Sequence, residues 1–382
     1  MYQNIFPVIA LILLTGGAAA QESIPIVRAN GKYVTIRSDD QLIQYGWQID
    51  AAQKLDIYPT SARKLVFYTD VDSISIAVDA RKVQFNFIFL LNGRDSAHTQ
   101  VRYDPSAKLA GVPTALDIRK KIEGQVFAMK VPTPAVFKVE NRAVWNGSDS
   151  IRIRIYYPGE GKNQRILYNI HGGAFVACNL DTHDNISRIL ANKTQSIVVA
   201  LDYRKPPEFP YPASLDDITT VLQWIISNAS SFGGDKNNMV WVGDSGGGLQ
   251  TMALAIKMQN ANRPKAIVLV NPAEDLRHYE HGSYALVVDS YLGGKNPDDS
   301  LISPVVAQNF SFVAPTLIIT SEHDGLKPQG VALYAKLLSS GVAAKTVDIP
   351  QMGHLAGFWA VGHANADMAV AEAVKFILAV SP

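Results

Sequence analysis

The chain has 382 residues, with 35 Lys and Arg against 34 Asp and Glu, and a formal net charge of +1. That length fits one large domain or two domains, and a hydrophobic fraction of 47% argues against disorder. The even charge balance excludes the strongly basic surface that nucleic-acid binding uses. The single Cys excludes an intramolecular disulfide and a cysteine-ligated metal cluster. We therefore expect a soluble enzyme or binding protein with no nucleic-acid partner.

Residues 1–20 predict an export signal. Residues 5–14 form an apolar run, Thr15-Gly16-Gly17 ends it, and Ala18-Ala19-Ala20 offers small residues for cleavage before Gln21. The run is shorter than the roughly 20 apolar residues that span a bilayer. No Lys or Arg precedes it, so a buried N-terminal strand or helix is the alternative. We predict an exported protein, periplasmic or extracellular, with no membrane span in the mature chain.

Residues 21–105 predict a β-rich accessory domain. Residues 32–37, 73–78 and 82–89 alternate between two faces, which is the period of a strand, and Asn92-Gly93 then favours a hairpin turn. Short strands at this spacing predict a small β-sandwich-like domain. We assign it to stability or docking, and the alternatives are carbohydrate binding and help in roofing an active site.

Residues 106–382 alternate between short apolar strands and helices. We expect strands at 151–157, 166–170, 196–202, 239–242, 266–270, 316–320 and 346–349, and helices at 114–129, 183–193, 214–228, 249–261, 330–340 and 365–380. Uniformly apolar strands between helices predict an α/β domain whose mostly parallel central sheet carries helices on both faces.

A Gly-x-Ser-x-Gly turn, Gly243-Asp244-Ser245-Gly246-Gly247, joins a strand to a helix. Such a strained turn projects the hydroxyl of Ser245 above the sheet, and the amide of Gly246 at the helix N-terminus can face a developing oxyanion. The same pentapeptide surrounds the nucleophile of trypsin-like proteases, but there no long helix follows and the His and Asp precede the Ser. A Gly-rich turn that binds phosphate or is merely structural is the other alternative.

Three further segments complete a serine-hydrolase pattern. Residues 171–174 (His-Gly-Gly-Ala) follow a strand and can turn backbone N–H groups towards one point, as an oxyanion hole needs. Asp324 follows the strand 316–320, and His354 lies in the loop after the strand 346–349. The order Ser245, Asp324, His354 is the one expected of α/β-hydrolases.

These segments predict a role for each residue. Ser245 is the expected nucleophile, His354 the general base and Asp324 the residue that orients His354. His323, His363 and His171 are the rival bases, and Glu322 and Asp275 are the rival acids. The expected oxyanion hole comprises Gly172, Gly173, Ala174 and Gly246, with the amides of the last three as donors, Gly172 shaping the turn and His171 pinning the loop. We expect Cys178 to be a small buried bystander.

Residues 110–382 resemble the hormone-sensitive-lipase-like (bacterial family IV) carboxylesterases of the α/β-hydrolase fold. Besides the serine turn and the His-Gly-Gly loop, residues 202–213 are similar to that family's Asp-Tyr-Arg-x-x-Pro-Glu-x-x-x-Pro-Ala segment. Ala174 stands where the family usually has a third glycine, and Lys327-Pro328 where an acidic residue is common. The resemblance implies a structural hydrogen-bonded pair of Asp202 and Arg204.

We predict an exported serine carboxylesterase that hydrolyses short-acyl esters, with acetyl esters of glycans among them, through an acyl-enzyme on Ser245. It needs no metal or cofactor. The expected roof of the site is the helix 114–129 and the segment 275–291, with Tyr279, Tyr284 and Tyr291 either lining the pocket or packed in the core. The alternatives are a serine peptidase or amidase on the same fold, and a non-catalytic binding module.

Overall fold

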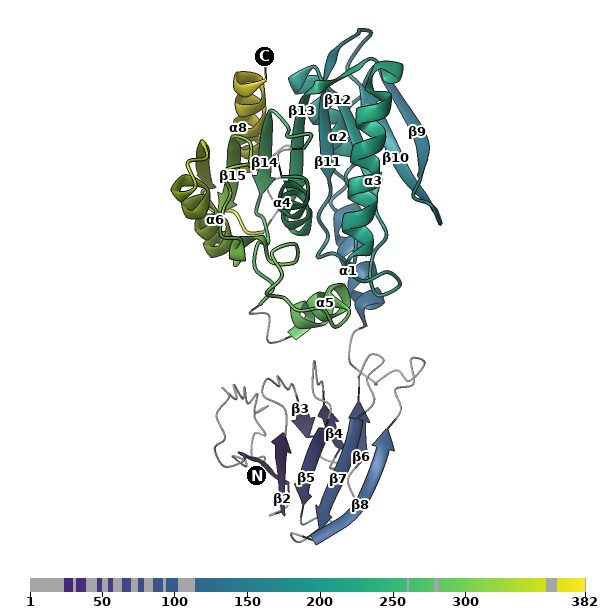
Figure 1. The fold of residues 1–382 in the computed structure, drawn as a ribbon, viewed down its shortest axis with the longest axis vertical. Coiled ribbons are helices and arrows are strands. Elements are labelled where there is room, and N and C mark those ends of the chain that lie inside the picture. Colours follow the sequence, from purple (N-terminus) through teal and green to yellow (C-terminus); the bar gives the residue numbers. More distant parts are fainter. Residues whose placement is uncertain are drawn as a thin grey trace. The chain divides into compact units, whose positions relative to one another are not determined.

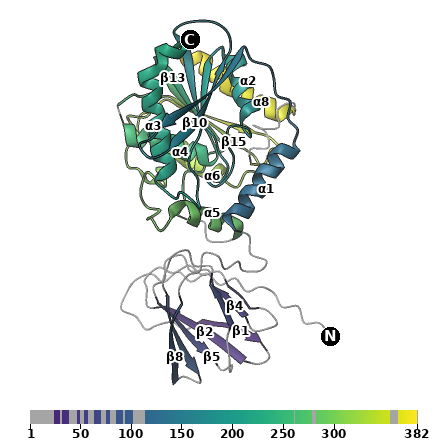
Figure 2. The same ribbon diagram turned by 90° about the vertical axis from the view of Figure 1, so that its right-hand side faces the viewer.

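The computed structural model describes residues 114–381 apart from 260, 278–281 and 355–362, and before them the backbone of eight strands (Figures 1 and 2). The chain divides into two compact units, Met1–Val112 and Pro113–Pro382. The predicted signal peptide lies outside the described residues.

The described strands of the first unit form two sheets. They are β1 (Ile24–Ala29), β2 (Lys32–Ser38), β3 (Trp47–Ile49), β4 (Lys54–Ile57), β5 (Lys64–Thr69), β6 (Ser75–Val78), β7 (Phe85–Leu91) and β8 (Arg94–Val101). A five-stranded sheet has the order β1-β2-β5-β7-β8, and a three-stranded sheet has the order β3-β4-β6. β7 and β8 pair antiparallel with Leu91 opposite Arg94, which is the hairpin that the Asn-Gly pair favours. The β-sandwich-like accessory domain stays a prediction.

The second unit is built on an eight-stranded sheet in the order β16-β15-β14-β13-β11-β12-β10-β9 (Figure 1). Its strands are β9 (Lys138–Trp145), β10 (Ser150–Tyr157), β11 (Gln164–Ile170), β12 (Ile197–Asp202), β13 (Gly234–Asp244), β14 (Ala266–Val270), β15 (Thr316–Ser321) and β16 (Ala344–Ile349). The strands from β16 to β12 run parallel, and β10 and β9 add an antiparallel edge. The mostly parallel sheet is therefore confirmed.

Helices cover both faces of this sheet (Figure 2). They are α1 (Ala115–Ala128), α2 (Asp184–Thr194), α3 (Ala213–Asn228), α4 (Gly246–Met258), α5 (Gly282–Leu292), α6 (Lys327–Ser339) and α8 (Ala364–Val380), with single 3-10 turns at Ala229–Phe232 and Pro304–Val306. Residues of α3, α4 and α6 share one buried core with the sheet, and residues of α1, α2 and α8 share the other. Alternate residues of β13 supply both cores: Met239 and Trp241 face the first, and Val240 and Val242 face the second.

The edge strand β9 is an element that the apolar pattern did not predict. Its sequence Lys-Val-Glu-Asn-Arg-Ala-Val-Trp mixes charged and apolar residues, and only Val144 in it is fully buried. Strands at the edge of a sheet have one exposed side and often carry charges there, so hydrophobic alternation is a weak signal for them.

The first turn of α1 is fixed by local hydrogen bonds. The Oγ1 atom of Thr114 accepts the backbone N–H of Asp117 at 3.2 Å, and the Asp117 carboxylate accepts the N–H of Thr114 at 2.9 Å. This reciprocal capping box satisfies two of the donors that a helix N-terminus leaves open. Within the described part of the chain, no helix has both the length and the apolar character that crossing a membrane requires.

Candidate active site

Ser245 occupies a sharp turn between β13 and α4. Its backbone has φ 51° and ψ −122°, a conformation that a non-glycine residue adopts only when its surroundings hold it there. The Ser245 N–H donates to the carbonyl of Val270 at 2.9 Å, and the Ser245 carbonyl accepts the N–H of Ala273 at 3.1 Å. A Cβ on Gly243 would lie 2.5 Å from the carbonyl oxygen of Gly247, so the turn closes only with glycine there. The end of β14 thus holds the turn that the motif predicted.

Three side chains from separate loops meet at this turn. The Oγ atom of Ser245 lies 2.9 Å from Nε2 of His354, and Nδ1 of His354 lies 3.0 Å from both carboxylate oxygens of Asp324. Asp324 and Ser245 are buried, whereas the His354 side chain is 37% exposed. The arrangement lets His354 take a proton from Ser245 while the buried carboxylate fixes the orientation of the ring.

The Asp324 carboxylate is held in its charged form. Burial opposes its ionisation, but hydrogen bonding and charge attraction from His354, with further hydrogen bonds, lower its pKa below the ordinary value. The N–H of Leu326 donates to Oδ1 at 3.0 Å, and the Asn271 amide donates to Oδ2 at 2.6 Å. Asn271 directly follows β14, and the motif analysis did not single it out.

The rival residues are engaged elsewhere. Glu322 accepts the backbone N–H of Gln351 at 2.7 Å, and Asp275 forms an ion pair with Arg277 at 2.7 Å. His323 uses its backbone N–H to bond the carbonyl of Met352, and His363 precedes the first turn of α8. Among the described residues, none of these four forms a hydrogen bond with Ser245, so the structure brings together the predicted trio.

The loop after β11 lies against the serine turn. Gly173, Ala174 and Phe175 have φ values of 117°, 49° and 66°, so the chain reverses sharply here. A Cβ on Gly246 would lie 3.3 Å from the backbone nitrogen of Phe175, which places the loop beside the start of α4. In the described part of the chain, no acceptor takes the N–H of Gly173, Ala174 or Gly246. These three amides are available as oxyanion donors.

Gly172 has a different role from the other residues of the predicted oxyanion hole. Its N–H donates to Oδ1 of Asp244 at 3.0 Å, so it is committed to the residue before the nucleophile. A Cβ on Gly172 would lie 2.5 Å from the other carboxylate oxygen of Asp244, which leaves no room for a side chain. Gly172 therefore shapes the turn and is not an oxyanion donor.

His171 is buried and stabilises the loop through hydrogen bonds and ring stacking. Its Nδ1 lies 2.7 Å from the carbonyl oxygen of Gly172, its ring stacks on Tyr203 at 4.3 Å, and its own carbonyl accepts the Tyr203 hydroxyl at 2.7 Å. Burial, and then the nearby positive charge of Lys205, hold the pKa of His171 well below its ordinary value. The ring is therefore neutral, as its expected non-titrating role requires.

Helix α1 forms hydrogen bonds with the segment that continues the oxyanion loop. Arg119 donates from Nε to the carbonyl of Val176 at 2.5 Å, and from Nη2 to the carbonyl of Pro206 at 2.7 Å. One turn later, Glu123 accepts the backbone N–H of Cys178 at 3.1 Å. We call Arg119 and Glu123 the α1 clamp. Sequence reasoning missed it, although the i, i+4 spacing of an Arg and a Glu on a helix of the expected roof was a visible signal.

The α1 clamp also binds the Pro-Glu part of residues 202–213. The guanidinium of Arg119 contacts both oxygens of Glu208, at 2.9 Å and 2.7 Å. The pKa of the Glu208 carboxyl is lowered mainly by this hydrogen bond from Arg119. Arg119 thus connects α1 to the segment after the oxyanion loop and to residues 206–208.

We expect Arg119→Ala to lower kcat for a short ester by about 10- to 100-fold, because small misplacements of catalytic groups carry costs of that order. The affinity for a trifluoromethyl ketone, which needs the oxyanion donors, should fall in parallel, while KM changes less. The matched control is Arg142→Ala, which removes a half-buried arginine paired with Glu140 on β9. Unchanged kcat and inhibitor affinity in Arg119→Ala would show that the α1 clamp does not position the loop.

The expected pairing of Asp202 with Arg204 is wrong. Arg204 forms a forked ion pair with the buried Asp217, at 2.8 Å from Nη2 to Oδ1 and 2.9 Å from Nε to Oδ2. Asp202 instead pairs with Arg152 and Lys205. β12 ends at Asp202, so Arg204 lies beyond the strand, where the two-residue period no longer places its side chain beside that of Asp202.

The expected roof is only partly described. Tyr279 lies outside the described residues. Tyr291 in α5 is fully buried and stacks on Phe175 of the oxyanion loop at 4.3 Å, so it packs in the core. Tyr284 is partly buried, and burial raises its pKa to about 12. Cys178 is fully buried and burial raises its pKa to about 12, which suits the bystander role.

Glu274 is a buried carboxyl group that the triad does not use. It follows Ala273, whose N–H bonds Ser245, and its own backbone N–H donates to Oε1 of Gln329 at 2.7 Å. Its side chain is fully buried, and neither carboxylate oxygen has a hydrogen-bond partner among the described residues. Burial raises its pKa well above the ordinary value, so the folded protein holds this group protonated.

Glu274 should therefore destabilise the protein as the pH rises. Above the unfolded-state pKa of 4.5 the unfolded chain releases a proton that the folded chain keeps, so the free energy of unfolding falls by about 1.4 kcal/mol per pH unit until the raised folded-state pKa is reached. We expect Glu274→Gln to remove this slope, measured by urea unfolding at several pH values. Glu372→Gln is the control of opposite sign, because Lys345 lowers the pKa of Glu372 and its stabilisation is lost as the pH falls. Parallel profiles for wild type and Glu274→Gln would contradict the assignment.

The described residues contain no group of three or more His, Cys, Asp or Glu side chains placed to hold a metal ion. The chemistry available at the site is that of a serine nucleophile, an imidazole base and backbone donors.

A strained serine turn on a mostly parallel sheet, with its base and acid following later strands, defines an α/β-hydrolase. A family model described as alpha/beta hydrolase fold matches residues 167–359. The chain belongs to this family, within its hormone-sensitive-lipase-like group, which confirms the resemblance found in the sequence.

Curated relatives and solved structures are esterases. The carboxylesterase NlhH of Mycobacterium tuberculosis is 31% identical over 265 residues, which are 63% of this chain and 83% of the relative. The versiconal hemiacetal acetate esterase of Dothistroma septosporum is 30% identical over 66% of this chain and 84% of its own. The hyperthermophilic esterase of Pyrobaculum calidifontis superposes with a TM-score of 0.64 at 25% identity, covering 73% of this chain and 93% of that one. The protein is a carboxylic-ester hydrolase.

Proposed function

We propose that this esterase is an exported enzyme that hydrolyses short-acyl esters, acetylated glycans among them, through an acyl-enzyme on Ser245. The observation that carries the serine mechanism is the hydrogen-bonded line from Asp324 through His354 to Ser245, with contacts of 3.0 Å and 2.9 Å.

In the acylation step, Nε2 of His354 takes the hydroxyl proton as Oγ of Ser245 forms a bond to the ester carbonyl carbon. The carbonyl oxygen gains negative charge, which the amides of Gly173, Ala174 and Gly246 stabilise. The C–O bond to the alcohol then breaks, and His354 returns the proton to the leaving oxygen.

In the deacylation step, water takes the place of the alcohol. His354 removes a proton from the water, the hydroxide attacks the acyl carbon, and the proton passes to Oγ of Ser245 as the acid leaves. Asp324 stabilises the charged imidazole in both steps without itself taking the proton.

Two observations support a short acyl group. Phe175 and Tyr291 stack beside the oxyanion loop within a buried apolar cluster that includes Val288 of α5, and we take this packing to restrict the acyl group. The Dothistroma relative is named for an acetate ester. The apolar run at residues 5–14 supports export, and export in turn supports extracellular glycan esters as substrates.

The test is an activity series on the full-length protein. p-Nitrophenyl esters from acetate to laurate, an acetylated xylo-oligosaccharide and amino-acyl anilides are compared by kcat/KM, and a fluorophosphonate probe is mapped by peptide mass spectrometry. We expect the highest kcat/KM for acetyl to butyryl esters, release of acetate from the oligosaccharide, and a label on Ser245. A preference for laurate or for anilides would overturn the substrate class, and a label elsewhere would overturn the mechanism.

A further inference from the structure

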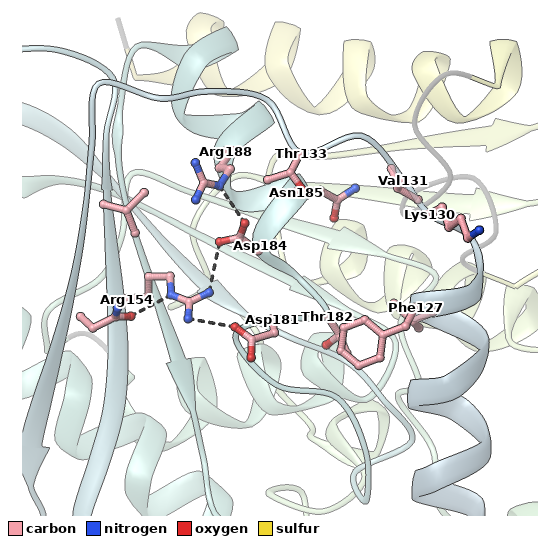
Figure 3. A pocket seen from close by; sticks show the side chains of 13 residues that line it. Phe127, Lys130, Val131, Thr133, Arg154, Asp181, Thr182, Asp184, Asn185 and Arg188 are labelled. Atoms are coloured by element: carbon pink, nitrogen blue, oxygen red, sulfur yellow. Dashed lines mark hydrogen bonds and ion pairs between the residues drawn. The ribbon is translucent and has the colours of Figure 1, made fainter.

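A cavity of about 520 Å³ opens where the end of α1 and the segment after it face β9, β10 and the first turn of α2 (Figure 3). Its lining includes no residue of the triad and none of the predicted oxyanion hole. The volume falls within the range of about 300–1,000 Å³ that is typical of small-molecule sites. We call it the α1–α2 pocket.

One wall of the α1–α2 pocket carries two arginines that share a carboxylate. Arg154 donates from Nη1 to Oδ1 of Asp184 at 3.1 Å, and Arg188 donates from Nε to Oδ2 at 2.7 Å (Figure 3). Arg154 also reaches Asp181 at 2.9 Å, but the Asp181 side chain is 67% exposed and its charge is screened by water. With Lys130, the lining holds three cations against two carboxylates, an excess of one positive charge.

The Nη1 and Nη2 side of the Arg188 guanidinium is available to bind a ligand. Its Nε is bound to Asp184, and its Nη1 makes only a long contact of 3.4 Å to the carbonyl of Pro134. No described residue accepts a hydrogen bond from Nη2 of Arg188. A planar guanidinium edge of this kind matches a carboxylate in geometry as well as in charge.

Apolar side chains complete the lining. They are Val126, Phe127, Val131 and Val139. Phe127 is 54% exposed, and it lines the pocket together with Thr182 (Figure 3). An occupant that covered this ring would remove apolar surface from water, which favours binding.

We propose that the α1–α2 pocket is a binding site for an apolar carboxylic acid, with the carboxylate on Arg188 and the hydrocarbon part against Phe127. The single excess positive charge suits a monoanion better than a doubly charged phosphate. Ester hydrolysis releases carboxylic acids, and butyrate, the most apolar acid of the proposed substrate range, is the candidate that the enzyme itself supplies. That source rests on the proposed function, whereas the binding site does not.

The test measures hexanoate binding to full-length Ser245→Ala protein by isothermal titration calorimetry, with hexanamide as the uncharged match. We expect hexanoate to bind and hexanamide to bind at least about tenfold more weakly, because charge-assisted hydrogen bonds are the stronger kind. Arg188→Gln in the same background should weaken hexanoate binding by about tenfold or more. Phe127→Ala should weaken it several-fold and, since the ring is half exposed, should leave folding intact.

Arg142→Gln serves as the control, because it removes a cation on the neighbouring strand that does not line the α1–α2 pocket. Its affinity for hexanoate should equal that of the parent. Absence of hexanoate binding, equal binding of hexanamide, or affinities unchanged by both Arg188→Gln and Phe127→Ala would overturn the proposal. Ester turnover by the wild type is measured separately, so failure of the proposed function is recognised on its own.

Discussion

Replacement of Ser245 by alanine is expected to lower kcat for p-nitrophenyl acetate by about 10⁶-fold, because the acyl-enzyme can no longer form. The oxyanion loop and the rest of the site stay in place, so a small rate above that of water should remain. The thermal unfolding midpoint should stay close to the wild-type value, because only one oxygen atom is removed.

The measurement compares initial rates and fluorophosphonate labelling of wild type, Ser245→Ala and Ser231→Ala. Ser231 is an exposed residue of the 3-10 turn after α3, and its hydroxyl donates to the carbonyl of Asn228, so its variant should match the wild type. Turnover by Ser245→Ala at a wild-type rate would remove the basis for a covalent mechanism.

Replacement of Asp324 by asparagine should have the second largest effect, a loss of about 10⁴-fold in kcat. Asp324 accepts hydrogen bonds from Asn271, Leu326 and His354, and an asparagine has only one oxygen to offer them. If its NH₂ group faces Nδ1 of His354, the ring must carry its proton on Nε2. It can then no longer accept the proton of Ser245.

Asp348→Asn is the matched control, because Asp348 of β16 accepts hydrogen bonds from Thr320 of β15 and Lys327 of α6, and no hydrogen bond among the described residues joins it to His354. Its kcat should stay within a few-fold of wild type. NMR of the imidazole nitrogens reports the tautomer directly. A fully active Asp324→Asn variant, or loss of activity in Asp348→Asn instead, would reassign the acid.

The sequence predicted the parts of the site that short, contiguous motifs define. Gly-x-Ser-x-Gly and His-Gly-Gly are short segments whose backbone needs are visible in their glycines, and each acid or base candidate follows an apolar strand. Because parallel strands end at one edge of the sheet, chain order was enough to bring Ser245, Asp324 and His354 to the same place.

Hydrogen bonds between distant segments of the chain could not be predicted from the sequence. Arg119 bonds residues 57 and 87 positions away, and nothing in a single sequence says which of several carbonyls a guanidinium will reach. Arg204 paired with Asp217 rather than Asp202 for the same reason. Gly172 was expected to shape the turn, but no spacing rule indicated that its amide would donate to Asp244.

The α1 clamp has a consequence for where the hydrolase begins. The family model matches from residue 167 onward, yet the helix that fixes the oxyanion loop starts at the capping box of Thr114 and Asp117. A truncated chain that starts at β9 would retain the whole sheet, the nucleophile, the base and the acid. It would lack Arg119 and Glu123, and the loop that must bind the oxyanion would lose its hydrogen bonds to α1. We therefore expect a fully active enzyme to start about fifty residues before the family match, at the first turn of a helix that holds no catalytic residue.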